Sequence, residues 1–224
     1  MSEKKRKTKT NARIHNTLLV LLILTIIGML GAFVWNIYKI AAKEAEAEAV
    51  KTVETEKPEN EFINEYYTIG HNATDLNKEY FRELNKALDA NDQKAVAEAV
   101  AKCFVTEYFT WTNKDGNYDV GGMQYIYTED QRDFEIKSRY SFYHDMDLYI
   151  SQLGTQSLIQ VSGVTVNSIE ETTYDIDDET SVKAYDIDLS WTYTSNGMST
   201  EDVQNNAVIT VADHDGRMEI VEID

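Results

Sequence analysis

The segment from Leu18 to Val34 most restricts what this chain can fold into, because it contains no charged residue and is almost entirely apolar. Extended to Tyr38, it has about the 20 residues that a helix needs to cross a hydrocarbon core of ~30 Å at a rise of ~1.5 Å per residue. A soluble core helix would not need the polar flanks that lie on both sides here. We therefore predict a transmembrane helix over residues 17–38.

A cleaved signal peptide is the main alternative to a retained anchor. Signal peptides have a shorter apolar core of roughly 7–15 residues and a cleavage site of small residues, which the alanines of residues 41–49 could imitate. Six Lys and Arg residues precede the apolar segment, and basic flanks remain on the cytoplasmic side of a membrane. The sequence thus predicts a cytoplasmic tail at 1–16 and a single-pass protein of the cell membrane with its C-terminal domain outside the cytoplasm.

Gly28 and Ala32 form a pair of small residues within the predicted span. Small residues four apart let two membrane helices approach closely. This pair is therefore a candidate for anchor packing in a homo-oligomer.

Charge is divided at the membrane boundary. Residues 1–38 hold six of the 21 Lys and Arg but one of the 39 Asp and Glu, which leaves 15 basic and 38 acidic residues beyond the anchor. A domain this acidic lacks the clustered Lys and Arg that bind phosphates, so we expect no nucleic-acid partner. It would instead favour cations or a basic protein surface, or simply remain soluble.

Cys103 is the only cysteine, so the domain contains no internal disulfide. Secreted eukaryotic domains more often use disulfides, which favours a bacterial envelope protein. Cys103 lies on the apolar side of a predicted helix, where a thiol is buried and inert.

Composition divides the external part into two regions. Residues 39–57 are rich in strong helix formers but poor in large apolar residues, which is typical of a solvated helix. Pro58 ends this segment. We predict a stalk and linker over 39–73 and a folded domain over 74–224.

Three helices are expected in the first half of the domain. Thr74 is a candidate N-cap for a helix from Asp75 to Ala90. Asn91 or Asp92 then begins a second helix, and a third runs from about Asp130 to Leu153, where Gly154 stops it. The apolar stripe of the second helix contains Val96, Val100, Cys103, Phe104 and Tyr108.

The second half changes to a period of two, which is typical of strands. Apolar residues alternate with polar ones from Tyr185 to Thr194, and Asn196-Gly197 and Asp215-Gly216 both match two-residue hairpin turns. The domain is therefore predicted to be α+β, with three helices packed on the apolar face of a curved four-stranded antiparallel sheet.

The stretch 109–127 has no helical period and is a candidate interaction loop, because aromatic residues dominate binding energetics. Asp115, Asn117 and Asp119 have the spacing of the first half of a calcium loop, but Val120 and Ile126 stand where an EF-hand has Gly and Glu. We therefore predict no metal site. The candidate interaction residues are Trp111, Asp115, Asn117, Asp119, Gly121, Gly122 and Tyr125.

No catalytic motif is present in the sequence. It contains no Gly-x-Ser-x-Gly and no phosphate-binding glycine motif, so neither catalytic residues nor a cofactor are predicted. The acidic run Asp175 to Glu179 is predicted to be a solvated hairpin loop. A few aromatic residues could either line a pocket between helices and sheet or pack in the core: Tyr140, Tyr143, Tyr149 and Trp191.

This layout of anchor, stalk, paired helices and curved antiparallel sheet resembles the nuclear-transport-factor-like fold. It also resembles the bitopic assembly subunits of type IV secretion and conjugation machines (the VirB-eight-like family), and residues 104–127 resemble anchored proteins of Gram-positive bacteria. The resemblance implies a scaffold that contacts other envelope proteins and is not an enzyme. Two alternatives remain: a tethered domain that binds or processes a small ligand, and a signal relay across the membrane.

Overall fold

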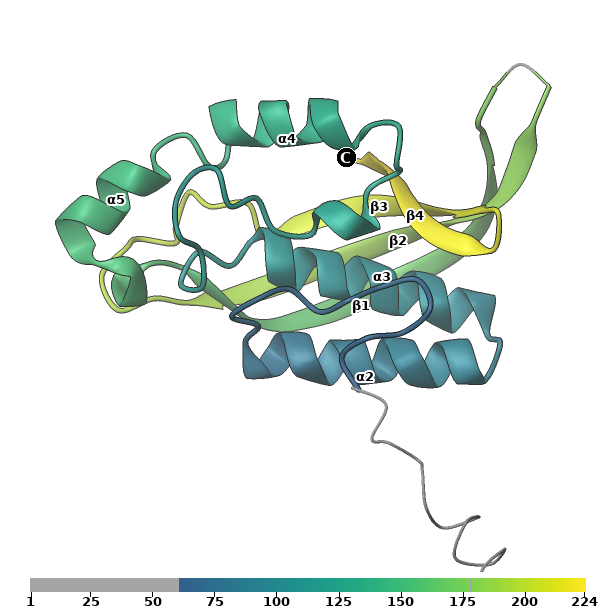
Figure 1. The fold of residues 1–224 in the computed structure, drawn as a ribbon, viewed down its shortest axis with the longest axis horizontal. Helices are drawn as coiled ribbons and strands as arrows, with labels where there is room; N and C mark the ends of the chain where they lie inside the picture. The colour runs from purple at the N-terminus through teal and green to yellow at the C-terminus, as the bar shows by residue number, and fades with distance from the viewer. Residues whose placement is uncertain (1–60, 178) are drawn as a thin grey trace, which may run out of the picture. The chain divides into compact units, whose positions relative to one another are not determined.

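The computed structural model of the chain describes residues 61–177 and 179–224, which form an α+β unit (Figure 1). Its elements in chain order are α2 (Asp75–Asp89), α3 (Gln93–Tyr108), η1 (Met123–Tyr125), α4 (Gln131–Tyr140), α5 (Met146–Leu153), η2 (Thr155–Ser157), β1 (Gln160–Asp175), β2 (Ser181–Thr194), β3 (Asn206–His214) and β4 (Arg217–Ile223).

The predicted tail, anchor and stalk, with Gly28 and Ala32, lie outside the described residues. Within the described part of the chain, no helix is both long and apolar enough to span a bilayer.

The sheet is the antiparallel meander that the period-two pattern predicts, with the strand order β1-β2-β3-β4. In β2 the alternating apolar residues Tyr185, Ile187, Leu189 and Trp191 are buried. Their polar neighbours are more exposed. One face of the sheet therefore forms the core and the other faces solvent, as expected for such alternation.

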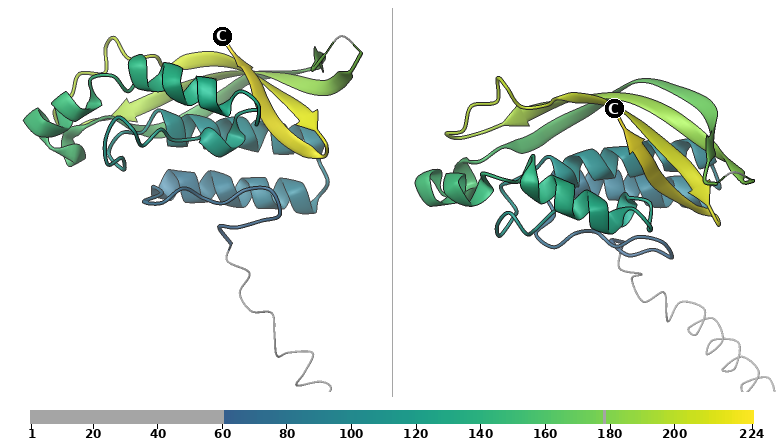
Figure 2. Two further views of the ribbon diagram at one scale, coloured as in Figure 1. Left: turned by 45° about the horizontal axis from the view of Figure 1, so that its top comes forward. Right: turned by 90° about the horizontal axis from the view of Figure 1, so that it is seen from above.

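Helix α3 is the centre of the core. It contacts all four strands on one side and α2 on the other, so the sheet, α3 and α2 form successive layers (Figure 2). The sequence predicted a single apolar stripe, but Ala97, Ala99 and Ala101 are buried as well. These small side chains let neighbouring layers approach closely, which explains why most of the helix surface is covered.

Helix α2 begins at the predicted N-cap. The Thr74 hydroxyl accepts a hydrogen bond from the Asn77 N–H, and the Asn77 side chain accepts one from the Thr74 N–H. This reciprocal capping box satisfies two backbone donors that the first turn of a helix leaves free.

The predicted third helix is wrong as a single element, because α4 and α5 are separated by residues 141–145. Phe142 and Tyr143 both pack their rings on Tyr108. Consecutive residues of a helix point about 100° apart at 3.6 residues per turn and cannot converge on one ring in this way. The core contacts of this pair therefore interrupt the helix.

The predicted hairpin turn at Asn196-Gly197 is also wrong, since β2 ends at Thr194 and β3 begins at Asn206. The Ser195 hydroxyl accepts from the N–H groups of Gly197 and Met198 and donates to the Ser157 carbonyl. The turn is thus held against η2 and does not join adjacent strand ends.

The turn at Asp215-Gly216 is confirmed. Both residues have positive φ, +53° and +85°, as a two-residue turn of this type requires.

The folded unit also extends ahead of Thr74, where the sequence predicted a linker. Tyr67 is 2% exposed, and its hydroxyl donates to the carbonyl of Met218 in β4 at 2.6 Å. Ile63 and Thr68 form an isolated antiparallel bridge. Residues 61–73 therefore pack on the domain.

Candidate functional site

The predicted interaction loop is mostly packed inward. Trp111, Gly121, Gly122 and Tyr125 are buried, whereas Asp115 is exposed. The segment folds back over the C-terminal end of α3, where η1 contacts that helix. Trp111 and Tyr125 thus stabilise the domain, whereas Tyr118 is exposed.

Glu107, near the end of α3, is the buried acid that this loop covers. It is 7% exposed, and its Oε1 accepts a hydrogen bond from the Tyr125 hydroxyl at 3.2 Å. The backbone N–H groups of Gly70 and Gly122 donate to the carboxylate as well. Burial nevertheless raises the pKa of Glu107, because the loss of hydration destabilises the charged carboxylate more than Lys114 and these hydrogen bonds stabilise it.

Lys114 lies in the same region and is also 7% exposed. Burial lowers the pKa of its ammonium group, and the charges of Glu107 and Asp119 oppose that shift. Among the described residues, Lys114 has no ion pair with an N–O distance of 4.0 Å or less and no hydrogen bond from its Nζ. Its ammonium group is therefore held in the protein without a direct partner.

Two glycines allow the loop to close over Glu107. A Cβ on Gly121 would lie 2.1 Å from the carbonyl oxygen of Glu107 and 2.8 Å from Lys114 Nζ. Gly122 has a φ of +73°, which favours glycine. The pair that the sequence singled out thus has a steric role.

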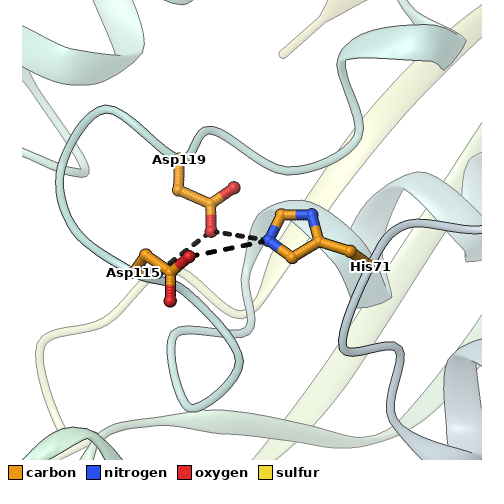
Figure 3. Close-up of side chains that lie close together, drawn as sticks. All are labelled: His71, Asp115 and Asp119. Carbon is orange, nitrogen blue, oxygen red and sulfur yellow. Dashed lines mark hydrogen bonds and ion pairs between the residues drawn. The ribbon is translucent and has the colours of Figure 1, made fainter.

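His71 lies beside the loop, close to Asp115 and Asp119, two of the residues that the sequence proposed for interaction (Figure 3). Its Nε2 is 3.4 Å from Asp119 Oδ2 and 4.0 Å from Asp115 Oδ2. The Asp115 N–H donates to the same Asp119 oxygen at 3.0 Å. Asn117, the middle residue of the calcium-like spacing, does not join this group. Its N–H donates to Asp147.

His71 and Asp119, but not Asp115, line a pocket of about 180 Å³. Among the described residues, Asn77 Nδ2 and Asn113 Oδ1 are buried without a hydrogen-bond partner, and both residues line this pocket. The side chains that line it and carry a charge or can carry one are His71, Glu107, Lys114 and Asp119.

A second, larger concavity of about 1010 Å³ is an open groove on another part of the domain. It is bordered by the segment 61–66, the end of α2, the start of α3 and the β3–β4 turn. Its lining residues are Glu61, Ile63, Asn64, Glu65, Tyr66, Asn85, Leu88, Asp89, Asn91, Gln93, Val96, Asp213, Gly216 and Met218.

The aromatic residues considered for an internal pocket do not form one together. Tyr143 and Trp191 are buried in the core, and Tyr149 packs partly buried on Trp111. Tyr140 is 79% exposed. Tyr143, Tyr149 and Trp191 thus pack in or against the core, whereas Tyr140 neither packs there nor lines a pocket with them.

The remaining candidates lie where the sequence placed them. Cys103 is buried, and burial raises the pKa of its thiol. Asp175, Asp177 and Glu179 are in or beside the β1–β2 turn, while Asp178 is outside the described residues.

No protein-family model, no curated protein and no solved structure matches this chain.

Sequence reasoning missed His71, Glu107 and Lys114. His71 was assigned to a linker, and Lys114 stands in a polar run typical of exposed turns. Glu107 gave one signal: it lies one helical turn after Cys103 and Phe104 and directly before Tyr108, all residues of the predicted apolar stripe.

Proposed function

We propose that this chain is a membrane-anchored extracytoplasmic interaction protein whose domain docks a basic segment of another envelope protein. The anchor rests on the uncharged run from Leu18 to Val34 and its basic flank. The docking site is the 1010 Å³ groove. The observation that carries the proposal is the combination of unneutralised carboxylates and apolar side chains in that groove.

Three carboxylates of the groove, on Glu65, Asp89 and Asp213, have no Lys or Arg partner within 4.0 Å among the described residues. Asp213 accepts hydrogen bonds only from uncharged groups, Gln93 Nε2 and the Gly216 N–H. Glu61 is different because Arg82 pairs with both of its oxygens. The groove therefore presents a negative surface that fits Lys and Arg side chains of a partner.

Apolar side chains lie between these charges. Ile63 is 51% exposed, and Leu88 is a partly buried residue of the same lining. An exposed isoleucine in a concave, acidic setting offers a contact for an apolar anchor. The occupant that fits is a protein segment with Lys or Arg on both sides of an apolar residue.

An assembly role in a conjugative or type IV secretion-like complex is the form of this proposal that the resemblance to VirB-eight-like subunits favours. Such subunits are scaffolds, and the acidic groove supplies a contact surface for one. On this account the protein has no turnover of its own.

The experiment places a photo-crosslinking amino acid at Leu88 in the full chain, expressed in its native membrane. The matched control carries the same amino acid at Leu148, which is 52% exposed on α5, away from the groove lining. We expect an adduct from position 88 and none from 148. The captured peptide should contain Lys or Arg close to the crosslinked residue.

Two results would refute the docking proposal. One is an adduct from position 148 with none from 88, which would place the partner on the α4–α5 side. The other is a peptide captured at 88 that lacks basic residues, because charge complementarity would then have no part in binding.

Binding of a small polar ligand is a second candidate, favoured by the ammonium group of Lys114 and by the unpartnered Asn77 Nδ2 and Asn113 Oδ1 in the smaller pocket. That pocket, at about 180 Å³, is smaller than the ~300–1,000 Å³ of usual ligand sites. The candidate therefore ranks below docking. An acylation experiment on the full chain in the presence of small anions tests this candidate. A bound anion should protect the amine of Lys114 from acylation but not that of Lys86, which is exposed.

A further inference from the structure

We propose that His71, Asp115 and Asp119 bind a divalent transition-metal ion, with Zn²⁺ as the reference ion. The inference does not depend on the docking function, because it concerns another part of the domain. Each of the three residues offers one ligand atom, and these atoms lie within 4.8 Å of one another (Figure 3).

The distances are close to those of a metal site. Zinc ligands lie about 2.0–2.1 Å from the ion, so two tetrahedral ligand atoms lie about 3.3 Å apart. His71 Nε2 is 3.4 Å from Asp119 Oδ2 and 4.0 Å from Asp115 Oδ2. Only Asp115 must move appreciably, and its side chain is 66% exposed and free to do so.

The donor types select the class of ion. One imidazole nitrogen with two carboxylate oxygens suits zinc and neighbouring first-row metals. Calcium prefers six to eight oxygen ligands, which this site does not offer. The spacing Asp115-x-Asn117-x-Asp119 matches only the first half of a calcium loop, and in the structure it is His71, not Asn117, that lies with the two aspartates.

The site is partly preorganised. Asp119 Oδ2 accepts the Asp115 N–H at 3.0 Å, which fixes the orientation of one carboxylate before any ion binds. Outer contacts of this kind orient metal ligands. Asp119 is also the least exposed of the three, at 15%.

The adjoining pocket supports a cation with bound water. Asn113 Oδ1 is a buried acceptor without a donor among the described residues, and it lines the same pocket as His71 and Asp119. Water on a metal ion is a strong hydrogen-bond donor and would satisfy it. The formal charges also agree, because the two carboxylates of Asp115 and Asp119 outnumber the single ammonium of Lys114 without counting Glu107.

A bound ion would join two distant segments. His71 belongs to the stretch that precedes α2, whereas the two aspartates belong to the loop that covers Glu107. Metal binding should therefore reduce the motion of residues 61–74 and 112–124 together.

The test is titration of the metal-free full chain in detergent with Zn²⁺ by calorimetry, followed by Co²⁺ absorption and hydrogen exchange. The variants are His71→Ala and Asp119→Asn. The matched control is His144→Ala, because His144 pairs with Asp145 at 2.8 Å but belongs to no three-residue cluster among the described residues.

We expect wild type and His144→Ala to share a zinc site that both site variants weaken at least tenfold. Zinc should slow exchange in 61–74 and 112–124 in wild type but not in His71→Ala. Equal zinc affinity in His71→Ala and His144→Ala would overturn the proposal, as would calcium binding as tight as zinc binding. His71 is 63% exposed, so its replacement should leave the fold intact. The intrinsic tryptophan fluorescence, to which the buried Trp111 and Trp191 contribute, verifies this.

Discussion

Gly121 is the residue at which one added methyl group should be most damaging. The Cβ of Gly121→Ala would lie 2.1 Å from a backbone oxygen of α3, which cannot move aside like the end of a side chain. Overpacking of this kind costs about 1–3 kcal/mol. Urea denaturation of the full chain in detergent, monitored by tryptophan fluorescence, measures this loss of free energy of unfolding.

Gly163→Ala is the matched control, because its Cβ would meet only Thr192 Oγ1 at an ordinary 3.5 Å. Gly163→Ala should change the free energy of unfolding by less than about 0.5 kcal/mol. Equal losses at the two positions would show that the loop does not close tightly on Glu107.

Glu107 should make stability depend on pH. Its pKa in the folded state is raised above the ordinary 4.5, so the folded state binds more protons than the unfolded state above that pH. The stabilisation from its protonated form is complete below pH 4.5 and is lost as the pH rises through the folded-state pKa.

Between pH 4.5 and the folded-state pKa of Glu107, the free energy of unfolding of wild type should therefore fall relative to that of Glu107→Gln, which has no proton to release. Urea midpoints measured at a series of pH values provide the comparison. Parallel pH profiles for the two proteins would contradict the raised pKa of Glu107.

At the level of residues, the sequence singled out Gly121 and Gly122 as parts of an interaction loop, whereas the structure gives them a steric role. Gly122 adopts a φ that few other residues permit, and Gly121 leaves no room for a Cβ beside the Glu107 carbonyl. Burial of Glu107 and Lys114 depends on contacts between segments far apart in the chain, such as the Gly70 N–H, and no local pattern contains that information.

Among the elements, the start of α2 offers a direct test of helix capping. Thr74→Ala removes the hydroxyl that accepts the Asn77 N–H, and loss of such a cap costs about 0.5–2 kcal/mol. Asp130→Ala is the control, since Asp130 occupies the N-cap of α4 but makes no capping hydrogen bond. Thermal unfolding of the full chain should show a clearly larger loss for Thr74→Ala, and equal losses would contradict the capping box.

Most elements followed from local patterns, and the exceptions have tertiary causes. The helices and the alternation of β2 depend on near neighbours, so their types were predicted correctly. The break between α4 and α5 arises because Phe142 and Tyr143 both pack on Tyr108. The turn at Asn196-Gly197 is held by Ser157, whose carbonyl accepts a hydrogen bond from the hydroxyl of Ser195, 38 residues away in the sequence.

For the whole molecule, the membrane topology is testable because the only native cysteine is buried. Glu201→Cys lies on an exposed part of the domain and should react with a membrane-impermeant maleimide in intact cells. Thr8→Cys, in the basic tail, should react only after the membrane is opened. The reverse pattern would contradict the predicted orientation, and loss of the tail from the mature chain would indicate a cleaved signal peptide.

The central claim is that carboxylates of the groove bind a basic partner, and charge reversal tests it most directly. The measurement is the affinity of the full chain for the protein captured at Leu88, at low and high salt, for wild type and Glu65→Lys/Asp89→Lys. Glu129→Lys/Glu170→Lys, with both exposed acids outside the groove lining, is the control for net charge.

We predict that the control binds within about twofold of wild type at low salt. The groove variant should lose at least tenfold in affinity, and high salt should remove most of the difference because it screens exposed charges. Equal affinity of the groove variant and the control would contradict the account.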